Sequence, residues 1–360
     1  MTSPTRLLIA ASGTGGHLFP AIALAQQLPN YEIEWLGTAN RMETNLIPAE
    51  YPLNTIPVEG FQQKFSPKTL KIMANFFFSI WQTQKLIKEH QINAVFTTGG
   101  YIAAPAILAA RMHNIPAIVH ESNYIPGKVT KFLSRWCDTV ALGFAGTSQY
   151  LPQTETVHVS TPVRSQFLTP QPLNLNIPDD AVMILVVGGS QGAVAVNKLV
   201  REAAPAWFDL GAYVVHLTGK NDPQADSLHH PNYIALPFSD NMAGLLQRAN
   251  LAISRAGAGT LTELAFTGTP AVLIPYPYAA EDHQTYNAQE YKEAGAGVVY
   301  QQAELTVEIL KSEIAQWLRS PELLADMSQK AQALAVNDSA ERLASLVRSL
   351  VRGSYFESGR

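Results

Sequence analysis

Four glycine-rich segments could bind a phosphorylated ligand, because each directly follows a run of apolar residues of strand length. They are residues 13–17 (Gly-Thr-Gly-Gly-His), 99–100 (Gly-Gly), 188–192 (Gly-Gly-Ser-Gln-Gly) and 257–260 (Gly-Ala-Gly-Thr). Glycine at such a turn lets backbone N–H groups approach a ligand, and the N-terminus of a following helix favours negative charge. Each segment alone could be an ordinary strand-to-helix turn. Four together indicate a nucleoside diphosphate ligand.

Two common nucleotide-binding patterns are absent from the sequence. The first segment has Leu18 where G-x-G-x-x-G requires its third glycine, and no acidic residue closes the second predicted strand, which argues against a nicotinamide dinucleotide. Gly219-Lys220 is followed by Asn221 and lacks the upstream glycine of a P-loop, so a P-loop ATPase is not expected.

The composition indicates a globular protein with about two domains. The 360 residues include 25 Lys and Arg against 29 Asp and Glu, a net charge of −4, and 47% are hydrophobic. So low a basic content disfavours nucleic acid as a partner. The single cysteine, Cys137, excludes an internal disulfide framework and a cysteine-based metal cluster, and it favours a reducing cytoplasm. The sequence contains no run of about 18 apolar residues.

Strand-length apolar runs alternate with segments of helical periodicity, which predicts an α/β protein with parallel sheets. The predicted strands are 7–11, 32–36, 94–98, 117–120, 182–187, 213–218, 233–236, 251–254 and 271–274, and the predicted helices include 20–28, 42–50, 69–89 and 105–113. A proline-rich passage, 161–180, predicts a linker between two similar domains. The pattern at 321–352 predicts helix, and 354–360 predicts a frayed tail.

Six motifs occur in an order that resembles the MurG family of glycosyltransferases. They lie at residues 11–17, 98–101, 120–123, 187–192, 257–263 and 282–287, and the resemblance runs from Leu7 to Leu350. It implies a GT-B architecture, in which two Rossmann-like domains with parallel sheets face each other across a cleft. Residues 1–162, with a helix at 338–352 packing back on them, would form the acceptor and membrane-facing domain, and 163–337 would bind UDP-GlcNAc.

The implied reaction moves N-acetylglucosamine, with inversion, from UDP-GlcNAc to the C4 hydroxyl of the muramoyl sugar of lipid I. The product, lipid II, serves peptidoglycan synthesis, and through it cell shape and division. A UDP-N-acetylglucosamine 2-epimerase on the same architecture would share the nucleotide site, as would a catalytically silent nucleotide-binding protein. The acceptor-side motifs, which include His17 and residues 120–123, favour the transferase.

The resemblance also implies roles for individual residues. Glu263 would bind the ribose, Ser190 and Arg164 the diphosphate, and Phe238 and Ser239 the uracil, although the family usually has an aliphatic residue where Ser239 stands. The full substrate-binding set is Thr14, Gly15, Gly16, Asn123, Arg164, Ser190, Phe238, Ser239, Ala258, Gly259, Thr260, Leu261, Thr262, Glu263, Gln284 and Asn287.

Each of these roles has a structural alternative. Glu263 could be a surface residue in a first helical turn, Ser190 a helix N-cap, Arg164 a partner in a linker salt bridge, and Asn287 a solvent-facing residue. Gln284 and Asn287 match sugar-hydroxyl contacts of the family.

Inverting transfer needs a general base for the acceptor hydroxyl. His17 is the first candidate, because it follows the first glycine-rich segment, and its structural alternative is a hydrogen-bond partner at a helix start. His120 and Glu121, at the end of a predicted strand, are rivals, and the sequence leaves the choice open. No Asp-x-Asp pair is present, so neither a metal clamp for the diphosphate nor another cofactor is expected.

The segment 68–88 carries the predicted contact with a membrane. Its helical stripe of Leu70, Met73, Phe77, Ile80 and Ile87 predicts an ordinary core face. Phe78 and Trp81 fall off this stripe and are bordered by Lys64, Lys68, Lys71 and Lys85, a pattern typical of interfacial docking. The alternative is a helix buried in the first domain. Docking here would place the protein peripherally on the cytoplasmic face of the bacterial membrane.

Overall fold

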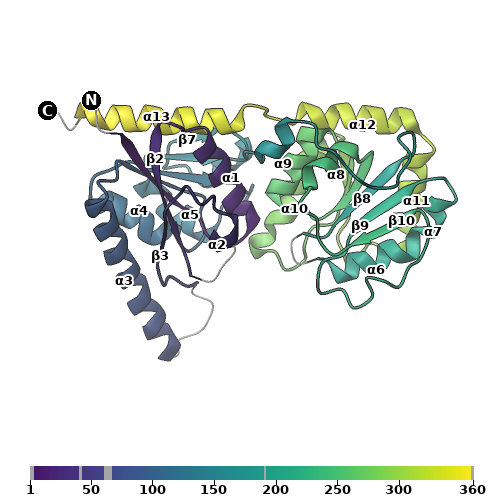
Figure 1. The fold of residues 1–360 in the computed structure, drawn as a ribbon, viewed down its shortest axis with the longest axis horizontal. Helices are drawn as coiled ribbons and strands as arrows, with labels where there is room; N and C mark the ends of the chain where they lie inside the picture. Colours follow the sequence, from purple (N-terminus) through teal and green to yellow (C-terminus); the bar gives the residue numbers. More distant parts are fainter. Residues whose placement is uncertain (1–3, 40–42, 61–66, 190–191, 358–360) are drawn as a thin grey trace. The chain divides into compact units, whose positions relative to one another are not determined.

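The computed structural model describes residues 4–39, 43–60, 67–189 and 192–357, and the chain forms two units (Figure 1). Unit 1 comprises Met1–Arg164 and Asp338–Arg360, and unit 2 comprises Ser165–Asn337. The boundary therefore falls near the start of the proline-rich passage. Most of that passage belongs to unit 2, whereas Arg164 belongs to unit 1.

Unit 1 contains a parallel sheet with the strand order β3-β2-β1-β4-β5-β6-β7 in its described residues. The strands are β1 (Thr5–Ala10), β2 (Tyr31–Gly37), β3 (Leu53–Thr55), β4 (Ala94–Thr97), β5 (Ala117–Glu121), β6 (Thr139–Leu142) and β7 (Thr156–His158). The sequence did not predict β3, β6 or β7. Strands β3 and β7 each contain only one apolar residue, so no apolar run marks them in the sequence.

Helices cover both faces of this sheet (Figure 1). Leu7 and Ile9 of β1 pack with α1 and α13, whereas the alternate residues Leu8 and Ala10 pack with α3 and α4. Because both faces are covered, the central strands read as continuous apolar runs. The helices are α1 (Gly15–Gln26), α2 (Glu43–Leu46), α3 (Pro67–Glu89), α4 (Ala103–Met112), α5 (Lys128–Leu133) and α13 (Ser339–Glu357), with 3₁₀ turns at Ser134–Trp136 and Ala145–Tyr150.

Unit 2 contains a second parallel sheet, with the order β10-β9-β8-β11-β12-β13 in its described residues. The strands are β8 (Met183–Val187), β9 (Tyr213–Leu217), β10 (Tyr233–Leu236), β11 (Leu251–Ser254), β12 (Ala271–Leu273) and β13 (Gly297–Val299). Ile184 and Val186 pack with α6 and α11, and Leu185, which points to the opposite face, is also fully buried. Both units are Rossmann-like, as predicted.

The helices of unit 2 follow the strands along the chain. They are α6 (Val194–Ala203), α7 (Pro205–Phe208), α8 (Met242–Arg248), α9 (Ala258–Thr267), α10 (His283–Glu293), α11 (Val307–Leu318) and α12 (Pro321–Ala333), with 3₁₀ turns at Ser165–Leu168 and Ala280–Asp282. The helical pattern at 321–352 is therefore two helices, α12 and α13. Helix α13 continues through residues 354–357, so the predicted frayed tail is wrong there.

Two predicted helices differ from the structure by more than two residues at one end. Helix α1 begins at Gly15, not at Pro20, because the carbonyl of Thr14 already accepts hydrogen bonds from the N–H groups of His17 and Leu18. Helix α2 spans only four residues of the predicted 42–50. The first difference matters for the site, because it places residues 15–17 in the first turn of a helix.

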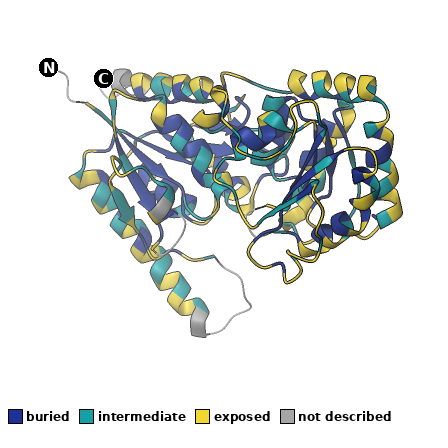
Figure 2. Cartoon of the chain, turned by 45° about the vertical axis from the view of Figure 1, so that its right-hand side comes forward, coloured by how far each residue is buried: buried dark blue, intermediate teal, exposed yellow. Residues whose placement is uncertain are grey.

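The predicted core face of α3 is wrong over the first half of the helix. Leu70 is 73% exposed and Phe77 63% exposed, Met73 is also exposed, and only Ile87 of the predicted stripe is buried. The buried residues of α3 are Ser79, Thr83 and Ile87, whereas none of residues 69–78 is buried (Figure 2). The hydroxyls of Ser79 and Thr83 donate to carbonyls one turn earlier, which satisfies them in the interior. No helix in the described part of the chain is long and apolar enough to cross a membrane.

Candidate functional site

All four glycine-rich segments lie at the carboxyl ends of the two central strands of a sheet. In unit 1, β1 and β4 are neighbours and precede residues 13–17 and 99–100. In unit 2, β8 and β11 are neighbours and precede residues 188–192 and 257–260. Strand order reverses at each of these pairs, and open α/β sheets bind ligands outside the carboxyl ends of the strands at such a switch point. The topology thus points to the same four glycine-rich turns as the sequence, two in each unit.

His17 connects the two glycine-rich turns of unit 1. Its Nδ1 lies 2.7 Å from the carbonyl oxygen of Thr98, which can only accept, so Nδ1 carries the proton of the neutral ring. Nε2 is then the unprotonated nitrogen, and it faces Gly100, where a Cβ atom would lie 3.7 Å away. No hydrogen-bond partner for Nε2 is found among the described residues. A fixed tautomer with an open Nε2 lone pair is the arrangement a general base requires.

His120 is enclosed in the interior of unit 1. Its Nε2 donates to the carbonyl of Ser160 at 3.0 Å, and its Nδ1 accepts from the hydroxyl of Ser122 at 3.3 Å. Burial lowers the pKa of His120 to about 4. Both ring nitrogens are occupied, so the geometry gives His120 the role of a support for the chain after β5.

Glu121 holds the loop that follows β5. Its Oε1 accepts from the backbone N–H of Asn123 at 3.1 Å and from the Asn123 side-chain amide at 3.4 Å, and its Oε2 accepts from the N–H of Gly127 at 3.0 Å. Oε1 accepts two of these hydrogen bonds and Oε2 accepts one, so the carboxylate is tied to this loop and only Oε2 keeps a further lone pair. Asn123 is thereby fixed at the same edge of the sheet as the turn containing Gly99 and Gly100.

Glu43 braces the first glycine-rich turn and was not predicted from the sequence. Its carboxylate accepts hydrogen bonds from the Ser12 hydroxyl at 2.6 Å, the Thr38 N–H at 2.8 Å and the Gly13 N–H at 3.3 Å. Burial alone would raise the pKa of Glu43, but these hydrogen bonds together hold it below its ordinary value. The buried carboxylate therefore fixes the backbone immediately before α1.

The remaining unit 1 candidates lie at the start of α1 or at the end of the unit. Thr14 is the N-cap of α1, and Gly15 and Gly16 form its first turn. A Cβ at Gly15 would lie 2.6 Å from the Phe19 ring, so a larger residue there would require this ring to move. The Arg164 guanidinium lies over the same ring, 4.7 Å from its centroid, which brings Arg164 close to the first helical turn.

Six candidates in unit 2, residues 258–263, form the first six positions of α9. Glu263 lies in the second turn, not in the first as the sequence suggested. Helical side chains point toward the N-terminus, so Glu263 is directed over Gly259 and Thr260. Gly259 has open space where a Cβ would stand, which leaves room for a ligand beside the carboxylate. The first-turn position, which both interpretations of Glu263 assumed, is therefore wrong, and the side chain is half-buried.

The glycine-rich turn after β8 is described on both sides of Ser190, which itself lies outside the described residues. Gly189 and Gly192 have φ values of +87° and +78°, which only glycine adopts readily. A Cβ at Gly192 would lie 2.5 Å from the carbonyl oxygen of Thr218, so the turn packs directly on the loop after β9.

Gln284 and Asn287 of α10 both contact the backbone before α9. Oε1 of Gln284 accepts from the N–H groups of Ala256 at 3.2 Å and Tyr276 at 2.9 Å, which directs its NH₂ group away from these loops. Asn287 is fully buried and donates to the Ala256 carbonyl at 3.3 Å. The alternative of a solvent-facing Asn287 is therefore wrong.

Phe238 and Ser239 follow β10. Phe238 is 56% exposed, which is high for a large apolar side chain. The Ser239 hydroxyl accepts from the N–H of Asn241, whose side chain in turn caps α8 through the N–H of Gly244. These bonds fix the backbone of the turn beside the exposed ring.

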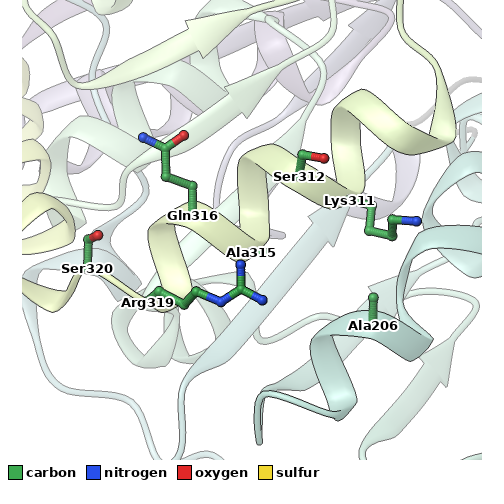
Figure 3. A pocket seen from close by; sticks show the side chains of 7 residues that line it. All are labelled: Ala206, Lys311, Ser312, Ala315, Gln316, Arg319 and Ser320. Carbon is green, nitrogen blue, oxygen red and sulfur yellow. The ribbon is translucent and has the colours of Figure 1, made fainter.

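A hollow on the surface of unit 2 lies along α11 and α7 and is lined by residues that include Ala206, Lys311 and Gln316 (Figure 3). None of the predicted site residues borders it. Within the part of the chain that the structure describes, no three His, Cys, Asp or Glu side chains are grouped so as to hold a metal ion.

A buried polar network supports the loop on which Gly192 packs. The Asn197 amide donates to the Thr218 carbonyl and to Asp222, each at 2.7 Å, and Arg201 pairs with Asp222 at 2.7 Å. The Asn197 carbonyl oxygen then accepts from His216 Nε2 at 3.0 Å. Burial, together with the positive charge of Arg201, lowers the pKa of His216 to about 3.

We expect this histidine to make unit 2 less stable in acid. An unfolded histidine titrates near pH 6.5. Below that pH the unfolded chain therefore binds a proton that His216 does not bind in the folded state. The free energy of unfolding should therefore fall from about pH 6.5 toward pH 3, by up to about 1.4 kcal/mol per pH unit for this group. Urea denaturation from pH 7 to pH 4.5 measures the slope. His216→Gln should remove this contribution and the exposed control His229→Gln should retain it; equal slopes in both variants would contradict the assignment.

Comparisons with known proteins agree with the fold and the order of the motifs. The glycosyltransferase family 28 N-terminal domain matches residues 7–142 and the family 28 C-terminal domain matches residues 183–343. A protein of Gloeothece citriformis (strain PCC 7424) is 65% identical over 347 residues, which are 96% of this chain and 96% of the relative. It is named UDP-N-acetylglucosamine–N-acetylmuramyl-(pentapeptide) pyrophosphoryl-undecaprenol N-acetylglucosamine transferase.

Of two similar solved structures, one shares the family and the other shares only the fold. The crystal structure of Acinetobacter baumannii MurG matches with a TM-score of 0.78 and 30% identity, over 96% of this chain and 100% of that one. A putative UDP-N-acetylglucosamine 2-epimerase from Listeria monocytogenes matches with a TM-score of 0.70 but only 13% identity, over 99% and 98% of the two chains. The second match shows a shared architecture alone.

Proposed function

Because this chain belongs to the MurG family of glycosyltransferases, we propose that it transfers N-acetylglucosamine from UDP-GlcNAc to the C4 hydroxyl of the muramoyl sugar of lipid I, forming lipid II, with His17 as the base. The observation that carries the proposal is the placement of all four glycine-rich turns at the two switch points. The epimerase alternative is not favoured, since it rests on fold alone.

The proposed reaction is a single displacement at C1 of the donor sugar. The acceptor hydroxyl gives its proton to Nε2 of His17 as its oxygen attacks C1, and the bond between C1 and the diphosphate breaks, so that UDP leaves. The Nδ1–H bond to Thr98 holds the ring while it becomes cationic. Backbone N–H groups at the start of α9 and near Gly189 and Gly192 favour the charge of the departing diphosphate. Arg164 is the proposed side-chain contact to the same group.

The proposed donor contacts come from three segments of unit 2: the loop after β10, helix α9 and helix α10. Phe238 offers its ring to uracil, and Glu263 accepts hydrogen bonds from the ribose hydroxyls. The NH₂ group of Gln284 donates to an oxygen of the sugar, because the carbonyl end of this amide is already occupied.

Incubating the protein with radiolabelled UDP-GlcNAc and a lipid I analogue tests the activity directly. Transfer of label to the acceptor supports the proposal. Conversion of the donor to its C2 epimer, with the acceptor unconsumed, would establish the epimerase instead.

The acceptor is carried on a polyprenyl chain, so the enzyme must meet it at a bilayer. We propose that the α3 patch, defined as Leu70, Met73, Phe77, Phe78 and Trp81, docks on the anionic cytoplasmic face. All five side chains are exposed, Phe78 and Trp81 stack with their ring centroids 5.5 Å apart, and Lys85 lies 5.9 Å from the Trp81 ring centroid. Lys71 is exposed nearby; Lys64 lies outside the described residues, as does the side chain of Lys68. The net charge of −4 gives no general attraction, so docking must be local.

We expect Phe78→Ser combined with Trp81→Ser to reduce co-sedimentation with anionic liposomes by about tenfold. Complete withdrawal of one such ring from an apolar environment costs about 1.5–3 kcal/mol, and each nearby cation adds about 1 kcal/mol at an anionic surface. Turnover of a long-chain acceptor should fall with it, whereas turnover of a short, water-soluble acceptor should be nearly unchanged.

Ile309→Ser is a suitable control, because Ile309 is an exposed apolar residue of α11 in unit 2. It should leave liposome binding unchanged. An equal loss of activity toward both acceptors in the α3 variant would refute docking through this patch.

A further inference from the structure

Arg255 joins three loops at the carboxyl edge of the unit 2 sheet. It directly follows β11, and its Nη1 donates to the carbonyls of Ile274 and Pro275, each at 3.0 Å, in the loop after β12. Its Nη2 donates to Oε1 of Gln302 at 2.7 Å, in the loop after β13. The guanidinium also lies over the Tyr276 ring, 5.5 Å from its centroid. One side chain thus ties the loop before α9 to both neighbouring loops.

The loop that Arg255 holds, residues 274–282, is strained at its far end. Glu281 and Asp282 have φ values of 55° and 51°, in the left-handed region that residues with a side chain rarely adopt. Such residues persist where the surrounding structure fixes them. They directly precede α10, whose second residue is Gln284. The direction of the Gln284 side chain therefore depends on how firmly this loop is anchored.

We propose that Arg255 is a positioning residue for the donor sugar: by anchoring the loop after β12, it sets where the NH₂ group of Gln284 lies. This inference rests on the donor site proposed above. The residues assigned to uracil and ribose depend less on Arg255, because Phe238 follows β10 and Glu263 is held within α9. Loss of the Arg255 bonds should therefore affect the sugar more than the nucleotide.

Arg248 provides a matched control in the same unit. Like Arg255 it is half-buried, and its Nη2 donates to three backbone carbonyls, those of Pro178, Asp179 and Ala181. These lie in the segment before β8, away from the glycine-rich turns. Replacing either arginine by lysine keeps the charge and removes the planar fork, so both variants lose similar backbone contacts.

The test compares Arg255→Lys with Arg248→Lys. We expect Arg255→Lys to lower kcat/KM for UDP-GlcNAc about tenfold while changing the inhibition constant of UDP less than twofold. Arg248→Lys should change neither, and thermal unfolding checks that both variants fold. Equal kinetics in the two variants, or a parallel loss of UDP affinity in Arg255→Lys, would overturn the proposal. If the unsubstituted enzyme neither transfers label nor binds UDP, the proposed function itself fails.

Gln302 provides a second test that leaves the arginine in place. Gln302→Ala removes one acceptor of the guanidinium and should lower kcat/KM for UDP-GlcNAc in the same direction but by less, with UDP inhibition unchanged. Gln302→Glu keeps an acceptor and should restore the unsubstituted value. If Gln302→Ala has no effect or Gln302→Glu fails to rescue it, the anchoring role of Arg255 is wrong.

Discussion

Replacing His17 by glutamine is expected to lower kcat by about 10²–10⁴-fold, the usual contribution of a positioned general base. The glutamine amide can still donate to the Thr98 carbonyl, so the bond between α1 and the turn after β4 has a substitute. What the variant lacks is the unprotonated ring nitrogen that faces Gly100. We therefore expect the dissociation constant of UDP-GlcNAc and the KM of the acceptor to change little.

Single-turnover kinetics and calorimetry separate these quantities. His113→Gln is a suitable control, because His113 caps the C-terminus of α4 in the same unit and belongs to no glycine-rich turn. The assignment of the base would be refuted if His17→Gln kept more than a tenth of the rate. A large loss of donor affinity with unchanged kcat would show instead that His17 binds substrate.

The architecture follows from the sequence because buried parallel strands are continuous apolar runs. The central strands β1, β4, β8 and β11 are all four to six residues long and were all predicted. The edge strands β3, β7 and β13 have three residues each and were not predicted, whereas the equally short β12 was, because its apolar run continues to Ile274. Their place in the sheets depends on pairing with distant strands.

Helical periodicity predicted which residues of α3 share a face, but not what covers that face. Leu70, Met73 and Phe77 lie on one stripe, yet the sheet and α4 cover only the later part of the helix, around Ser79, Thr83 and Ile87. Two small hydroxyl residues took buried positions that a periodicity argument assigns to large apolar ones. Because Leu70, Met73 and Phe77 are exposed and not buried, they add three side chains to the proposed docking surface.

The glycine turns were visible in the sequence, but the residues that support them were not. Glu43 lies 30 residues from Gly13, and Gln302 lies 47 residues from Arg255. No local spacing connects such pairs, since they meet only once the strands are ordered in the sheet. The same holds for His17, whose tautomer is set by Thr98, 81 residues away.

Replacing Glu263 tests the proposed nucleotide-binding part of the site. Glu263 lies one turn after Gly259, which has open space where a Cβ would stand, and we propose that its carboxylate accepts hydrogen bonds from both ribose hydroxyls. A hydrogen bond to a charged group contributes about 1.5–3 kcal/mol, so losing two should weaken binding by at least about 10²-fold. Glu263→Ala is therefore expected to raise the dissociation constants of UDP and UDP-GlcNAc by a similar factor.

A thermodynamic cycle with 2′-deoxy-UDP identifies the contact. This ligand already lacks one of the two hydroxyls, so Glu263→Ala should cost it about half as much binding free energy as it costs UDP. Glu308→Ala is the control, because Glu308 is a surface residue of α11 that pairs with Lys311. Equal losses for the two ligands would show that Glu263 acts without touching the 2′-hydroxyl. If affinity is unchanged in a folded Glu263→Ala variant, the ribose lies elsewhere, and the role of α9 in donor binding would be limited to its N-terminal N–H groups.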